Sequence, residues 1–263
     1  MIGIDLGSRN VKVIRFEAGK IIEQRVYDTI EFYRHYGKNI NNRLQLDWEL
    51  LQLPREDIVA TGYGKITIEL EGAVQIPEIQ AHSIGAVYQS GIDDFTLLDI
   101  GGQDTKVIKI RKSRPVDFMT NDRCAASSGR YMENMAAVLG ISLQELATYS
   151  EEPVELSSTC AIFGETEIIA RIVEGCSLER LAAGVNYALY KRFSTMLNKL
   201  HSDIIIMSGG GSLNQALKDI IIRETGRQVM ELAEPLFNGA LGCCAYGEDM
   251  MRETGKEVPG TPD

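Results

Sequence analysis

The residues best suited to chemistry are two aspartates, each followed two positions later by a glycine. Residues 2–8 read IGIDLGS, and residues 97–106 read LLDIGGQDTK. In each stretch an apolar run leads to the carboxylate of Asp5 or Asp99, and a second β-like run follows the glycine. Glycine lets backbone N–H groups approach phosphate oxygens, and the carboxylate can hold Mg²⁺ through water. A single turn of this kind is common in plain hairpins, but two copies predict similar halves that close on one nucleotide.

A run of three glycines supports the nucleotide interpretation. Residues 209–211 are all glycine and lie between an apolar run at 204–208 and a predicted helix. A tight strand-to-helix turn needs one glycine or two, whereas three favour close approach of the backbone to a ligand. We expect this turn to face adenosine and its α-phosphate. The small-residue stretch at 234–242 either packs a helix against the nucleotide or packs it against another helix.

Composition limits the function classes. The 263 residues allow two modest domains. The net charge of −10 argues against a nucleic-acid partner, which needs clustered Lys and Arg. The longest apolar run, 204–207, is too short to span a membrane, and the first residues lack a signal-peptide pattern. We therefore expect a cytoplasmic protein whose five cysteines are core residues, metal ligands or reactive thiols rather than disulfides.

Strand and helix patterns alternate in both halves, which predicts an α/β fold class. Residues 32–43 mix aromatic, basic and Asn side chains and are expected to form an irregular excursion. Strands are predicted at 2–5, 11–17, 21–27, 57–61, 95–110 (a hairpin), 115–119, 203–208 and 228–231. Helices are predicted at 47–53, 78–89, 128–139, 142–149, 163–173, 178–200, 213–223 and from 235.

Two cysteine segments narrow the interpretation further. Residues 121–130 read NDRCAASSGR, and residues 158–167 read STCAIFGETE. They resemble the cysteine motifs of the ATP-dependent activators of 2-hydroxyacyl-CoA dehydratases. That family includes the benzoyl-CoA reductase ATPase subunits (BadF/BadG/BcrA/BcrD type) and belongs to the sugar kinase–heat-shock-protein–actin superfamily. The segments 60–65, 77–82 and 239–242 are also similar, so the resemblance extends to about Tyr246.

The resemblance implies an actin-like ATPase fold, with two similar ribonuclease H-like halves around a nucleotide cleft. The first phosphate turn falls in a subdomain at 1–95. The second phosphate turn, both cysteine motifs and the adenosine turn fall in a subdomain at 96–250, and a tail follows at 251–263.

The resemblance also implies a function. Family members are homodimers that use ATP hydrolysis to push one electron from a shared [4Fe-4S] cluster, one per homodimer, to a partner dehydratase or reductase. The electron comes from ferredoxin or flavodoxin. Cys124 and Cys160 would be the ligands from each chain, since a two-fold axis doubles two thiolates to the four that a cubane cluster needs. Cys176, Cys243 and Cys244 lack such motifs, and we expect the last two, which lie in a small-residue helix, to pack in the core. For any single cysteine, burial in the core is the alternative.

The nucleotide would be ATP or ADP with Mg²⁺. The resemblance implies that Asp5 and Asp99 orient Mg²⁺ and the attacking water, while Gln103 or Asp104 positions that water. Asp104 could equally be a strand residue that faces solvent. The three histidines show no ligand spacing, and we expect structural roles for them. The remaining expected nucleotide contacts are Gly7, Ser8, Lys12, Gly101, Gly102, Gly209, Gly210, Gly211, Asn214 and Gly239.

Two departures from the family pattern stand out. The first turn usually reads GSTTTK, but residues 7–12 read GSRNVK, so hydroxyls after Ser8 are missing. After Cys124 the usual AAGTG becomes AASSG, which keeps a hydroxyl at Ser128. We expect nucleotide affinity and cluster exposure to differ accordingly, and the chain could be a diverged paralogue.

Two other functions remain open. A small-molecule kinase on the same fold, without a cluster, would use Asp104 as its base and would leave the cysteine motifs unexplained. An actin-like filament protein would polymerise with nucleotide and would tolerate the loss of Cys124.

Overall fold

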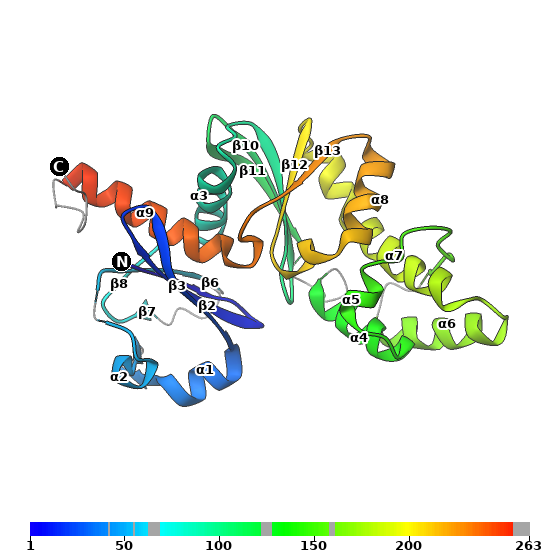
Figure 1. Ribbon diagram of the computed structural model, residues 1–263, viewed down its shortest axis with the longest axis horizontal. Coiled ribbons are helices and arrows are strands. Elements are labelled where there is room, and N and C mark those ends of the chain that lie inside the picture. Colours follow the sequence, from blue (N-terminus) through cyan, green and yellow to red (C-terminus); the bar gives the residue numbers. More distant parts are fainter. Residues whose placement is uncertain (42, 55, 63–68, 122–127, 158–160, 255–263) are drawn as a thin grey trace. The chain divides into compact units, whose positions relative to one another are not determined.

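The computed structural model describes residues 1–41, 43–54, 56–62, 69–121, 128–157 and 161–254 (Figure 1). The chain divides into two units. Unit 1 comprises Met1–Asp93, Ser113–Pro115 and Leu236–Asp263, and unit 2 comprises Asp94–Lys112 and Val116–Pro235. A five-stranded sheet lies in each unit, ordered β3-β2-β1-β6-β8 in unit 1 and β11-β10-β9-β12-β13 in unit 2. The two sheets share one topology, because each begins with an antiparallel meander and continues with parallel strands. The α/β class is confirmed.

The sheet of unit 1 places the first aspartate near the end of a strand that is buried on both faces. Its strands are β1 (Ile2–Leu6), β2 (Asn10–Glu17), β3 (Lys20–Asp28), β6 (Ile58–Gly62) and β8 (Ala73–Gln75). β1 pairs antiparallel with β2 and parallel with β6. Ile2 and Ile4 are completely buried. These strands agree with the predicted ones, apart from β8, which the sequence pattern did not indicate.

The stretch expected to be irregular is ordered, so that prediction is wrong. Apart from residue 42, which lies outside the described residues, its residues fall in α1 (Thr29–Tyr36), β4 (Gly37–Ile40) and the first position of β5 (Arg43–Leu46). α2 (Trp48–Leu51) follows. β5 also pairs with β7 (Glu69–Leu70) to make a three-stranded sheet. Asp28 caps α1 by accepting from two backbone N–H groups. Phe32 is fully buried and packs against Tyr27 and Tyr36, so aromatic contacts hold together a segment whose composition looked loop-like.

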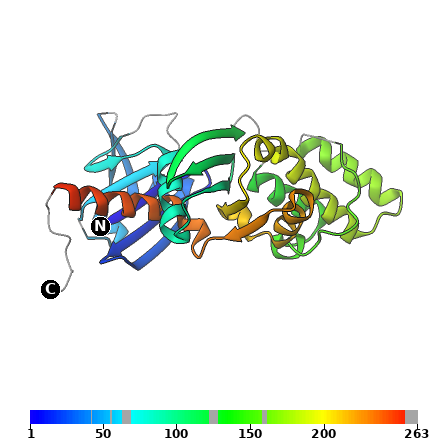
Figure 2. The same cartoon turned by 90° about the horizontal axis from the view of Figure 1, so that it is seen from above.

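Two helices of unit 1 pack closely against each other. α3 (Glu78–Ser90) and α9 (Asn238–Thr254) meet through glycines, and a Cβ on Gly242 would collide with the Ala81 carbonyl. Asn238 donates to the His82 carbonyl at 2.9 Å and accepts from Gln89 at 3.0 Å. α9 also packs on β1, β2 and β6 (Figure 2). It therefore lies with unit 1, whereas the predicted ranges put it with the second subdomain.

The sheet of unit 2 repeats this plan around the second aspartate. Its strands are β9 (Phe95–Ile100), β10 (Thr105–Arg111), β11 (Arg114–Asn121), β12 (Ile204–Ser208) and β13 (Gln228–Glu231). β9 pairs antiparallel with β10 and parallel with β12. This register sets Asp99 opposite Lys106 on one side and Ser208 on the other.

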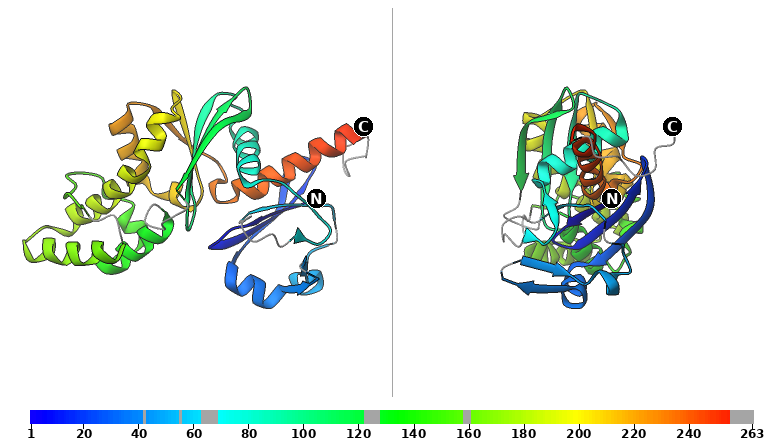
Figure 3. Two further views of the ribbon diagram at one scale, coloured as in Figure 1. Left: turned by 180° about the vertical axis from the view of Figure 1, so that it is seen from behind. Right: turned by 90° about the vertical axis from the view of Figure 1, so that its left-hand side faces the viewer.

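The helices of unit 2 pack partly on that sheet and partly on one another (Figure 3). They are α4 (Gly129–Leu139), α5 (Leu143–Leu146), α6 (Ala161–Val173), α7 (Leu178–Lys199) and α8 (Gln215–Thr225), with 3₁₀ turns at Gly210–Leu213 and Pro235–Phe237. α7 packs against α4, α6 and α8. The predicted stop of α4 is confirmed, because Gly140 takes the left-handed conformation at its end with φ of 70°. Within the described residues, none of the helices is long and apolar enough to cross a membrane.

Candidate active site

Asp5 lies near the end of β1, opposite Lys12 on β2. The Lys12 Nζ is 3.1 Å from Asp5 Oδ2, and the Asp5 side chain is 3% exposed. The other carboxylate oxygen, Oδ1, is buried and has no hydrogen-bond partner among the described residues. A buried acceptor without a donor is unfavourable in a native protein. A water molecule bound to Mg²⁺ would supply the missing donor to Asp5 Oδ1. Carboxylate oxygen is also the usual protein ligand of Mg²⁺, so the side chain fits this ion.

The start of α9 lies close to this carboxylate. A Cβ on Gly239 would lie 3.2 Å from Asp5 Oδ2 and 2.9 Å from His82 Nε2. Only glycine fits there without displacing one of them. In the first turn, a Cβ on Gly7 would lie 2.9 Å from Lys12 Nζ. Gly7 therefore lies against the lysine of the Asp5–Lys12 ion pair, and Gly239, from the far end of the chain, lies against its aspartate.

In the second turn, both oxygens of the Asp99 carboxylate have a partner. Ser208 Oγ donates to Asp99 Oδ1 at 2.7 Å. Lys106 Nζ lies 3.7 Å from Asp99 Oδ2 and 2.8 Å from Asp104 Oδ2. The Asp104 side chain is 22% exposed, so it is an ion-pair partner within the turn and not a residue directed at solvent alone. The N–H of Gly101 donates to the Asp104 carbonyl at 2.9 Å and closes the turn.

The two turns repeat one device, an aspartate paired across a hairpin with a lysine seven residues later. Lys106 is the counterpart of Lys12, but it was not among the predicted site residues. The repeat itself could have identified it, because Lys106 stands at the matching position of the second copy. Ser208 was also missed. Its bond to Asp99 depends on the β9–β12 register, which no local pattern reveals.

The glycine triplet lies directly after β12, beside the second turn. Gly209 has φ of 77°, and a Cβ there would lie 2.9 Å from Asp99 Oδ1. Gly211 packs against the Ile100 side chain. Asn214 caps α8, because its Oδ1 accepts from Leu217 N, and its Nδ2 donates to Asn186 Oδ1 at 2.8 Å. Both polar ends of the Asn214 side chain are thus used within the protein, and its assignment to adenosine remains a prediction.

The predicted cluster ligands, Cys124 and Cys160, lie outside the described residues. Among the described residues, no group of three or more His, Cys, Asp and Glu side chains could hold a metal ion. Burial raises the pKa of Cys243 well above its usual value and raises the pKa of Cys244 to about 12. These two thiols therefore stay protonated at neutral pH, consistent with the predicted packing role.

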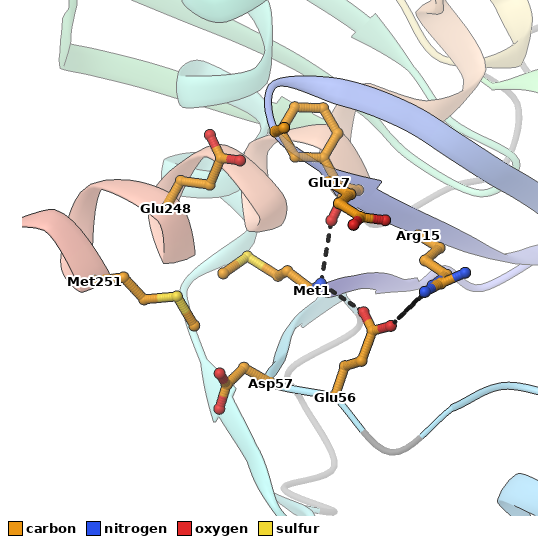
Figure 4. A pocket seen from close by; sticks show the side chains of 9 residues that line it. Met1, Arg15, Glu17, Glu56, Asp57, Glu248 and Met251 are labelled. Atoms are coloured by element: carbon orange, nitrogen blue, oxygen red, sulfur yellow. Dashed lines mark hydrogen bonds and ion pairs between the residues drawn. The ribbon is translucent and has the colours of Figure 1, made fainter. Parts of the chain in front are cut away.

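Unit 1 also contains a pocket of about 350 Å³, and none of the residues that line it is a predicted site residue (Figure 4). Glu56 lines it and accepts from the Met1 ammonium at 2.6 Å and from Arg15 at 2.8 Å. Burial alone would raise the pKa of Glu56, but these two cations outweigh it and lower that pKa. The pocket is also lined by Phe16, Glu17, Ala18, Asp57, Glu248 and Met251.

Comparison with known proteins identifies the family. The family model for the BadF/BadG/BcrA/BcrD ATPases matches residues 2–247. The chain belongs to this family. It is 34% identical over 214 residues to the 2-hydroxyisocaproyl-CoA dehydratase activator of Clostridioides difficile, covering 78% of this chain and 80% of that protein. It is 30% identical over 255 residues to the (R)-2-hydroxyglutaryl-CoA dehydratase activating ATPase of Acidaminococcus fermentans, covering 93% and 95%.

The structural comparison agrees. The solved structure of the Clostridium difficile 2-hydroxyisocaproyl-CoA dehydratase activator with bound ADPNP superimposes with a TM-score of 0.81 at 28% identity. The match covers 100% of this chain and 99% of that one. The predicted resemblance and the actin-like fold are confirmed. As a member of this ATPase family, the protein binds and hydrolyses ATP.

Ser208→Ala should both destabilise the protein and slow its ATPase. The substitution removes the hydrogen bond that Ser208 donates to a buried Asp99 oxygen, which we expect to lower the free energy of unfolding by about 1–3 kcal/mol. Urea unfolding and phosphate-release assays would measure the two effects. Ser194→Ala, which removes a hydroxyl that donates to Lys191 on the surface of α7, is the matched control. Equal stability and activity in the two variants would contradict the role of Ser208.

Proposed function

We propose that this protein is an ATP-dependent one-electron donor. It uses ATP hydrolysis to transfer a low-potential electron from a [4Fe-4S] cluster to a partner enzyme of the 2-hydroxyacyl-CoA dehydratase or reductase type. The observation that carries the proposal is the presence of both cysteine motifs, around Cys124 and Cys160, in a chain that matches the ATPase family along 2–247. Relatives named as dehydratase activators support the nature of the partner.

The nucleotide part of the proposal rests on the two Asp–Lys pairs. Asp5 and Asp99 orient Mg²⁺ and water, and the unpartnered Asp5 Oδ1 supports this assignment. Lys12 and Lys106 neutralise phosphate charge, while Gly7 and Gly102 offer backbone N–H groups to phosphate oxygens. Because Asp104 pairs with Lys106 at 2.8 Å, we assign the positioning of the attacking water to Gln103. Phosphoryl transfer needs placement and charge stabilisation more than covalent chemistry.

The cluster part rests on the donor set. Two cysteines per chain become four in a homodimer, which matches the thiolate count of a cubane cluster. When bound, the cluster supplies reversible one-electron chemistry. Cys124 and Cys160 would hold it as thiolates, and ferredoxin or flavodoxin would supply the electron.

Iron and sulfide analysis tests this function directly. After anaerobic purification and reconstitution, we expect about four irons per homodimer and a broad visible absorption that dithionite bleaches. A protein that hydrolyses ATP but takes up no iron would contradict the proposal. It would favour the kinase alternative, and a screen of phosphate acceptors would follow.

A further inference from the structure

The start of α4 is hydrogen-bonded to the second phosphate turn. Ser128 Oγ donates to the Gly102 carbonyl at 2.9 Å. The Gly129 N–H donates to the Gly101 carbonyl at 2.9 Å, and the Arg130 N–H donates to the Gly102 carbonyl at 3.1 Å. Three successive residues at the helix start therefore donate to two successive carbonyls of the turn.

The hydroxyl of Ser128 is used in an unusual way. A serine at a helix N-cap normally accepts a hydrogen bond from the second or third N–H of the helix, which stabilises the helix. Ser128 is the N-cap residue of α4, yet its side chain makes no capping bond. It is fully buried, and its hydroxyl donates to Gly102 instead. The Ser128 hydroxyl therefore binds the turn and does not cap α4.

Gly129, the next residue, also allows close contact between the start of α4 and the turn. A Cβ on Gly129 would lie 3.3 Å from the Gly101 oxygen and 3.6 Å from the Gly102 Cα, so a larger residue would press on the turn. The absence of a side chain at 129 lets the helix start approach the turn backbone closely.

Planar peptide groups join the carbonyls that accept from α4 to backbone N–H groups of the turn, which the proposed function directs at phosphate. The Gly102 N–H and the Gly101 carbonyl belong to one rigid peptide plane, as do the Gln103 N–H and the Gly102 carbonyl. A phosphate oxygen that binds these N–H groups therefore fixes the orientation of the carbonyls that accept from α4. Hydrogen bonds joined in this way also polarise one another.

We propose that Ser128 is a positioning residue that couples the second phosphate turn to the start of α4, so that loss of the third phosphate changes the order of that helix start. The consequence for electron transfer rests on the proposed function, because Cys124 stands four residues before Ser128 in the sequence. The coupling must act in both directions, since linkage between two binding events is reciprocal.

Hydrogen–deuterium exchange on the full-length protein tests the coupling. Exchange of the α4 amides from Gly129 onward is measured with saturating Mg²⁺ and either ADP or a non-hydrolysable ATP analogue. In the wild type we expect the analogue to slow exchange about fivefold or more relative to ADP. Ser128→Ala should abolish that difference while still binding both nucleotides, and Ser128→Thr, which keeps the hydroxyl, should retain it.

A matched control and a second pair of variants make the outcome decisive. Ser142 begins α5 in the same unit and accepts from the Glu145 N–H at 3.0 Å, so Ser142→Ala should keep the wild-type difference. If Ser128→Ala fails to fold, Ser128→Val is compared with Ser128→Thr, which has nearly the same shape but retains a hydroxyl. A full nucleotide difference in the alanine or valine variant would overturn the proposal. The exchange experiment needs no cluster, so its failure is distinct from a failure to bind iron.

Discussion

Asp5→Asn should reduce the turnover number for ATP hydrolysis by roughly a hundredfold or more, the scale seen when a charge-stabilising group is removed from an active site. The substitution keeps the shape of the side chain but removes the negative charge that pairs with Lys12 at 3.1 Å and that we assign to Mg²⁺. Steady-state phosphate release at saturating Mg·ATP measures the effect. Iron content after reconstitution should not change.

An aspartate elsewhere in unit 1 provides the control for this substitution. Asp57 is exposed and precedes β6, and Asp57→Asn should hydrolyse ATP at the wild-type rate. Asp99→Asn should show a loss comparable to that of Asp5→Asn, since the second turn repeats the Asp–Lys pair. Wild-type turnover in folded Asp5→Asn protein would remove Asp5 from the proposed Mg²⁺ site.

Cys124→Ser and Cys160→Ser should each reduce bound iron from about four per homodimer to background. Serine replaces a thiol, which ionises readily when it binds iron, with an alcohol that stays protonated near neutral pH. Each substitution removes two ligands from a cluster shared by two chains. The dissociation constant for ATP, measured by titration calorimetry, should remain within a few-fold of the wild-type value because the two Asp–x–Gly turns are unaltered.

Cys176→Ser is the matched control, because Cys176 is a free, half-buried thiol outside both motifs. We expect it to bind as much iron as the wild type. Cys243 and Cys244 are poor competitors for iron, since burial raises the pKa of both thiols. Full iron in both motif variants would reject the ligand assignment while leaving the ATPase assignment intact.

Local sequence patterns predicted much of the site. The Asp–x–Gly turns lie between paired strands as expected, and the glycine triplet follows β12 and begins beside Asp99. These features can be predicted from the sequence because turn chemistry and strand alternation depend on residues that are neighbours in the chain. The α8 start was predicted two residues early, since a 3₁₀ turn at Gly210–Leu213 precedes Gln215.

Long-range features were not accessible in the same way. The segment at 32–43 was expected to be irregular, but burial of Phe32 among aromatic neighbours orders it. α9 follows unit 2 in the chain and yet packs in unit 1, where Gly239 lies close to Asp5. Such packing depends on which surfaces meet after folding, and hydrophobic periodicity within one helix does not specify its partner.

The sequence by itself determined the family, the two Asp–x–Gly turns and the cysteine motifs, because each is a short pattern of residue types with a direct chemical meaning. The tertiary structure alone decided how those parts are held. The Ser208–Asp99 bond joins residues 109 apart, and the Ser128–Gly102 bond joins residues 26 apart. Both depend on strand register and helix placement, which arise from the packing of the whole unit and leave no periodic trace in the sequence.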